Sequence, residues 1–185
     1  MPVRNLANTV TVARIALVPL VVLAMLADDG SGGWRWVAAV LFALAASTDR
    51  LDGYIARRLD QVTDWGKLMD PIADKALMGA TLVTLSWLGE LPWWVTLVIL
   101  VRELGITAMR FAVLRYVVIP ASRGGKIKTV LQSVGIGLFV MPLDQLPPFV
   151  RAVAIVVIAA AVVMTVVTGI DYLRRGWAVR RAASR

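Results

Sequence analysis

The chain has 185 residues, of which 59% are hydrophobic, yet its formal net charge is +8. A soluble domain is roughly 45–50% apolar, so this composition indicates a membrane protein, and its length fits a single domain over residues 1–185. The chain has no cysteine and no histidine, which excludes disulfides, thiolate chemistry, Ser-His-Asp catalysis and imidazole metal ligands. Its basic residues lie beside apolar runs, so nucleic acid is not an expected partner.

A membrane-spanning helix needs about 20 mostly apolar residues. In chain order, six segments meet this requirement: residues 10–27, 34–56, 70–88, 92–118, 126–143 and 148–173. The first is not expected to be a cleaved signal peptide, because Arg14 interrupts it and no small-residue cleavage pattern follows. The sequence therefore predicts an all-α integral membrane protein with six transmembrane helices.

The charges at the helix ends predict an orientation. One set of ends carries most of the basic residues: Arg4, Arg50, Arg57, Arg58, Lys67, Arg115, Arg123, Lys126, Lys128, Arg174, Arg175, Arg180, Arg181 and Arg185. The opposite ends carry Asp28, Asp29, Glu90 and Asp144, with Arg35 and Arg151 at their edges, and five tryptophans: Trp34, Trp36, Trp87, Trp93 and Trp94. The positive-inside rule places both termini in the cytoplasm, and the tryptophans are typical of a belt at the outer interface.

Four aspartates stand near the cytoplasmic ends of the second and third segments. Asp49 and Asp52 are three residues apart, and Asp70 and Asp74 are four apart, so each pair shares one helix face. The connection between the two segments is short, so the helices are expected to be antiparallel neighbours that bring the four carboxylates together. Such a cluster needs a counter-charge, and all-oxygen ligands suit Mg²⁺ or Mn²⁺. Asp60 and Asp64 are interpreted as solvated loop charges.

The same region carries a recognisable pattern. Asp49, Asp52, Gly53, Ala56, Arg57, Gly66, Asp70 and Asp74 fit D-x2-D-G-x2-A-R-x8-G-x3-D-x3-D at every fixed position. This run resembles the signature of the CDP-alcohol phosphatidyltransferases. The resemblance implies an integral membrane enzyme of six helices, a homodimer, in which an alcohol attacks CDP-diacylglycerol and releases CMP.

The resemblance also implies roles for individual residues. Asp49, Asp52, Asp70 and Asp74 would hold two divalent ions, and Asp74 would also be the general base. Spacing alone does not select Asp74 over Asp70 as the base. The implied residues for binding CDP-diacylglycerol are Asn8, Thr11, Gly53, Arg57, Thr63 and Gly66.

Further stretches bear on the acceptor alcohol. The start from Asn5 to Arg14 is similar to N-P-N-x-L-T-x-x-R of family members whose acceptor is sn-glycerol 3-phosphate, with departures that include Ala7 and Val10. Arg110, Lys126 and Lys128 would form a cationic pocket for a phosphorylated acceptor. Arg102 and Glu103, in the middle of a span, are interpreted as an internal ion pair or a helix-orienting contact.

Three alternatives remain open. Phosphatidylglycerol or an inositol phosphate is the acceptor in other branches of the family. A transporter or cation channel would also explain charges inside spans, but the aspartates lie at one membrane face and no inverted repeat is evident. The leading expectation is phosphatidyl transfer to sn-glycerol 3-phosphate at the cytoplasmic face of a bacterial plasma membrane.

Overall fold

The computed structural model describes residues 6–58, 64–113 and 123–183, and within these ranges it is helical with no strand. Its α-helices are α1 (Leu6–Leu26), α2 (Gly33–Arg58), α3 (Asp64–Trp87), α4 (Trp93–Val113), α5 (Arg123–Val140) and α6 (Pro148–Ala183). A short 3-10 helix, η1 (Leu143–Gln145), lies between α5 and α6. The predicted all-helical architecture is confirmed.

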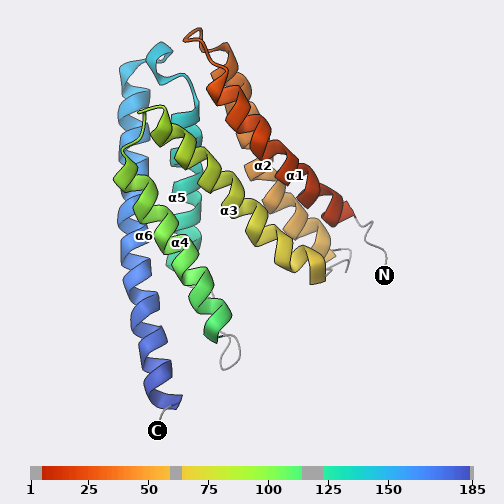
Figure 1. The fold of residues 1–185 in the computed structure, drawn as a ribbon, viewed down its shortest axis with the longest axis vertical. Helices are drawn as coiled ribbons and strands as arrows, with labels where there is room; N and C mark the ends of the chain where they lie inside the picture. The colour runs from red at the N-terminus through yellow and green to blue at the C-terminus, as the bar shows by residue number, and fades with distance from the viewer. Residues whose placement is uncertain (1–5, 59–63, 114–122, 184–185) are drawn as a thin grey trace.

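The helices form one bundle with two distinct ends (Figure 1). The α1–α2, α3–α4 and α5–α6 connections gather at the end drawn at the top, here called the tryptophan end. The opposite end, where α2 ends and α3 begins, is here called the aspartate end. Helix α1 packs against α2 and α3, whereas α6 packs against α5 and α4, and α3 contacts both α4 and α5. Helix α2 also contacts α5, so α2 and α3 together join the two halves of the bundle.

The distribution of polar side chains is unlike that of a soluble bundle. Arg14, Arg35 and Lys128 are almost completely buried, as are several threonines and Gln132. Large apolar side chains from every α-helix are exposed, among them Leu23, Val40, Val83, Val101, Val134 and Val167. An apolar exterior around a partly polar interior is the arrangement expected of helices surrounded by lipid.

Length and composition alone single out α6. Within the described residues, only its segment Pro148–Tyr172 is both long and apolar enough to cross a membrane, while Thr11–Leu26, Gly33–Thr48 and Ile127–Val140 are shorter apolar stretches. The aspartate-bearing part of α2 and the charged positions in α3 and α4 interrupt the apolar runs of those helices. The six transmembrane helices therefore remain a prediction.

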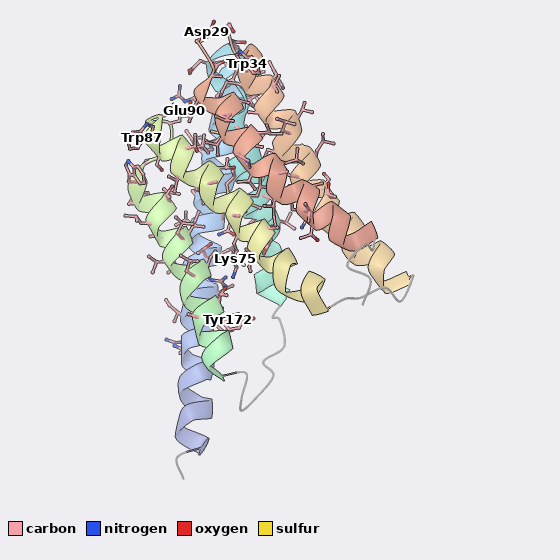
Figure 2. All side chains as sticks on the ribbon, turned by 45° about the vertical axis from the view of Figure 1, so that its right-hand side comes forward. Asp29, Trp34, Lys75, Trp87, Glu90 and Tyr172 are labelled. Carbon is pink, nitrogen blue, oxygen red and sulfur yellow. The ribbon has the colours of Figure 1, made fainter. Side chains whose placement is uncertain are left out.

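The tryptophan end is held by a buried arginine. Arg35 of α2 pairs with Glu90 in the α3–α4 connection and donates to the Phe139 carbonyl of α5 at 2.8 Å. Burial raises the pKa of the Glu90 carboxyl, and Arg35 partly offsets this effect. The five predicted belt tryptophans are exposed on helices that begin or end here, and Trp34 and Trp87 lie at this end in Figure 2.

Candidate active site

The aspartates of the signature lie on two neighbouring helices at the aspartate end. Asp49 and Asp52 belong to the last three turns of α2, and Asp70 and Asp74 to the first three turns of α3. The two helices contact each other and run in opposite directions (Figure 1), which confirms the predicted antiparallel neighbours. Of these four, the structure describes only the side chain of Asp74, which is half-buried. The described side chains contain no group of three or more acidic ligands.

Asp74 lines a cavity of about 50 Å³ between α3, α4 and α5. Its polar neighbours in the wall are Lys75 from α3, Glu103 from α4, and Thr129 and Gln132 from α5. The cavity has room for a few water molecules. The candidate base thus lines an internal space whose wall is largely apolar and whose other charged residues are Lys75 and Glu103.

A chain of hydrogen bonds ties α3 to α4 beside this cavity. The Lys75 ammonium donates to the Thr107 hydroxyl, which donates to the backbone carbonyl of Glu103 at 2.7 Å. In Figure 2, Lys75 lies away from the tryptophan end, which carries Glu90 and Trp34. Lys75 directly follows Asp74, so this contact helps to hold the segment that carries the candidate base.

Glu103 is the centre of a charged cluster that joins three helices. Its carboxylate accepts hydrogen bonds from Lys128 of α5 and from Arg102 Nη1 at 2.9 Å. Arg102 Nη2 donates to Thr168 Oγ1 of α6 at 2.9 Å, and the guanidinium carbon lies 5.9 Å from the centre of the Tyr172 ring. The predicted internal ion pair of Arg102 and Glu103 is present, and Lys128 is its third member.

The other predicted site residues occupy helices that reach the aspartate end. Thr11 is buried on α1. The structure gives a helical backbone, without a described side chain, for Asn8, Asp49, Asp52, Arg57, Asp70, Arg110 and Lys126. Gly53 and Gly66 lie in α2 and α3, and Thr63 lies outside the described residues. The backbone therefore places those of these residues that it describes on helices that extend toward the end opposite the tryptophans.

Four polar residues beside the cavity were not predicted: Lys75, Thr107, Thr129 and Gln132. Lys75 adjoins Asp74, and Thr107 lies one helical turn after Glu103. Their closeness in the sequence to residues already singled out could have identified them. Gln132 is buried and donates to Thr165 of α6 at 3.0 Å, a contact between helices that the sequence alone does not indicate.

The comparisons with known proteins agree with this geometry. The family model described as CDP-alcohol phosphatidyltransferase matches residues 4–167. This all-helical chain, with its paired aspartates on α2 and α3, belongs to the CDP-alcohol phosphatidyltransferase family. The family is generally dependent on a divalent metal and is membrane-associated in bacteria.

Individual relatives are similar over most of the chain. A "probable phosphatidylglycerophosphate synthase" of Mycobacterium tuberculosis is 52% identical over 174 residues, covering 94% of this chain and 82% of the relative. A "CDP-diacylglycerol–glycerol-3-phosphate 3-phosphatidyltransferase" of Bacillus subtilis is 36% identical over 190 residues, covering 94% of this chain and 95% of the relative. A "cardiolipin synthase (CMP-forming)" of Streptomyces coelicolor is 40% identical over 111 residues, covering 58% of this chain and 50% of the relative.

Proposed function

We propose that this protein transfers the phosphatidyl group from CDP-diacylglycerol to sn-glycerol 3-phosphate, giving phosphatidylglycerol phosphate and CMP. The observation that carries the proposal is the complete eight-position signature on two adjoining antiparallel helices. The similarity to relatives named for this activity, over nearly the whole chain, supports the choice of acceptor.

The proposed setting is the bacterial plasma membrane, with six spanning helices in a single domain over residues 1–185. The exposed apolar side chains on all six helices support this arrangement. The excess of basic residues at the aspartate end supports a cytoplasmic position for this end and for both termini. The diacylglycerol tails would stay in the bilayer while the head group reaches the cytoplasmic face. The resemblance to the family further leads us to propose a homodimer.

The donor set at the aspartate end fits divalent metal ions. Asp49, Asp52, Asp70 and Asp74 offer only carboxylate oxygens, which Mg²⁺ and Mn²⁺ prefer, and neither cysteine nor histidine is available to attract softer metals. We propose that these four residues hold two such ions. When bound, they would neutralise the diphosphate and stabilise the charge that develops during transfer.

Residues on α1 to α3 are proposed to bind CDP-diacylglycerol. The absence of a side chain at Gly53 and Gly66 allows a ligand to approach the helix backbone closely, and the guanidinium of Arg57 suits a phosphate. Asn8, Thr11 and Thr63 complete the proposed set. Thr11 is buried at the start of α1, so its role would be to shape the inner wall of the site.

Asp74 is proposed to remove the proton from the 1-hydroxyl of sn-glycerol 3-phosphate. The hydroxyl oxygen then forms a bond to the β-phosphorus, and the bond from that phosphorus to the oxygen of CMP breaks. A carboxylate is the natural base here because the chain has no histidine. Arg110, Lys126 and Lys128 are proposed to bind the acceptor phosphate, which needs charge-assisted donors.

A panel of acceptors tests this function. The purified full-length protein is supplied with Mg²⁺ and CDP-diacylglycerol, and CMP release is measured with sn-glycerol 3-phosphate, phosphatidylglycerol or inositol phosphate. We expect release with sn-glycerol 3-phosphate. Release with phosphatidylglycerol alone would overturn the proposed acceptor in favour of the activity named for the S. coelicolor relative, and ion flux in liposomes without CMP release would favour a transporter.

A further inference from the structure

Lys128 is an unusual residue for a phosphate site because it is nearly inaccessible and already paired. Its side chain is 2% exposed, and its ammonium donates to the Glu103 carboxylate across the α4–α5 interface. The Asp74 carboxylate is also close enough to attract this ammonium electrostatically. Lys128 therefore interacts both with the candidate base and with an acidic residue that the proposed mechanism does not use.

We propose that Glu103 is the positioning residue of the acceptor site, which holds the Lys128 ammonium where the phosphate of the acceptor binds. This inference rests on the proposed function. Glu103 would not touch the reacting atoms, and its effect would pass through Lys128.

The chemistry of Lys128 explains why it needs an anchor. A lysine has a long, flexible stem, and a buried ammonium without a partner is strongly unfavourable. An ammonium has three N–H donors, and its bond to Glu103 uses one of them. The pairing would therefore keep Lys128 charged and in place while leaving donors for an anionic acceptor.

Glu103 is itself held from the side away from the cavity. Arg102 donates to the same carboxylate and is tied to Thr168 of α6, and it faces the groove between α4 and α6. Its stem packs closely on Gly169, where an added Cβ would lie 3.3 Å from Arg102 Cγ. Glu103, by contrast, lines the cavity of Asp74. The cluster thus has a fixed outer cation, Arg102, and an inner cation, Lys128, with Glu103 between them.

The direction of the effect on KM separates positioning from simple electrostatics. Removing a negative charge beside a site for an anion would by itself strengthen binding and lower KM for sn-glycerol 3-phosphate. Positioning predicts the opposite, because Lys128 would lose the partner that keeps it charged and in place. We expect Glu103→Gln to raise KM for sn-glycerol 3-phosphate about tenfold and to change KM for CDP-diacylglycerol less than twofold.

A double-mutant cycle tests whether Glu103 acts through Lys128. Lys128→Gln should raise KM for sn-glycerol 3-phosphate, and the double variant Glu103→Gln/Lys128→Gln should be no worse than Lys128→Gln alone. Glu90→Gln is the matched control, since Glu90 also pairs with a buried cation but lies at the tryptophan end. If Glu103→Gln does not fold, Glu103→Asp, which keeps the charge but shortens the reach, replaces it in the cycle, with a smaller rise expected.

The possible results have distinct meanings. A fall in KM for sn-glycerol 3-phosphate, equal rises for both substrates, or effects of Glu103→Gln and Lys128→Gln that add fully would each overturn the positioning role. Those results would leave the proposed function intact. An unchanged KM in Lys128→Gln would overturn both the positioning role and the place of Lys128 in the acceptor site. Wild-type protein that releases no CMP with sn-glycerol 3-phosphate would overturn the proposed function and this inference with it.

Discussion

Asp74 differs from an ordinary helix-end aspartate in its surroundings. It is half-buried and lines an internal cavity together with Lys75 and Glu103. A solvated carboxylate at a helix end would not line such a cavity, nor would it interact with a buried cation of another helix, as Asp74 does with Lys128. These surroundings are consistent with a group that must receive a proton from a substrate held inside the protein.

Replacing Asp74 by asparagine tests this role. Asparagine has nearly the same shape but cannot act as a base and is a poorer metal ligand, so we expect CMP release to fall by about 10²- to 10⁴-fold. The helical circular dichroism should be unchanged. Asp144→Asn is the matched control, because Asp144 is exposed at the tryptophan end and should keep wild-type turnover. Near-normal activity in Asp74→Asn would contradict the assignment.

Some side-chain positions could be predicted from the sequence and others could not. The spacing of the four aspartates placed them on α2 and α3, since helix periodicity fixes which residues share a face. Lys126 and Lys128 are two residues apart and do not share a face, so periodicity did not show which of them faces the interior. In the bundle, α5 is oriented about its axis so that Lys128 is buried. The pairing of Lys128 with Glu103 depends on how α4 and α5 pack.

At the scale of elements, a glycine allows α5 and α6 to pack closely. Helices α5 and α6 pack at Gly135, where an added Cβ would lie 3.1 Å from Ile158 Cδ1 and 3.3 Å from the Ile158 backbone. The backbone of α6 cannot move away from an added Cβ as the end of a flexible side chain could. Small residues at such crossings are the usual means by which membrane helices approach closely.

Substitution of this glycine should separate the two helices. We expect Gly135→Ala to destabilise the protein by about 1–3 kcal/mol, as overpacking does, and to lower the thermal midpoint measured by tryptophan fluorescence. Gly105→Ala is the control, because an added Cβ at Gly105 meets nothing within 4 Å. If both variants unfold at the same temperature as the wild type, the α5–α6 contact is not as close as described.

Some of the predicted helix bounds agree with the structure and others do not. The predicted segment 34–56 is close to α2 (Gly33–Arg58), but α3 begins at Asp64 rather than residue 70, and α6 continues to Ala183 rather than residue 173. Hydropathy detects only the apolar part of a helix. The bounds of α3 and α6 were missed because both helices continue into polar sequence. The end predicted at residue 118 for the fourth segment lies outside the described residues.

At the scale of the molecule, the two ends differ in charge. The arginines at the edges of the tryptophan end, Arg35 and Arg151, each pair with an acidic residue there. The aspartate end carries the excess of basic residues. This asymmetry supports the proposed orientation in a bilayer, in which the candidate site faces the cytoplasm.

The lack of native cysteine makes this orientation directly measurable. A single cysteine is introduced by Ser31→Cys, in the exposed α1–α2 connection, or by Ser184→Cys near the C-terminus. A membrane-impermeant maleimide applied to intact spheroplasts should label the first variant and should label the second only after permeabilisation. The reverse pattern would contradict the proposed orientation, and labelling of both in intact spheroplasts would contradict a fixed even number of spans.

The central claim is the transfer of an intact phosphatidyl group to sn-glycerol 3-phosphate. The most direct measurement supplies the wild-type protein with CDP-diacylglycerol, Mg²⁺ and deuterium-labelled sn-glycerol 3-phosphate, and analyses both CMP and the lipid product by mass spectrometry. We expect one CMP for each phosphatidylglycerol phosphate formed, with the label in the new glycerol phosphate. CMP released without label in any lipid would contradict it.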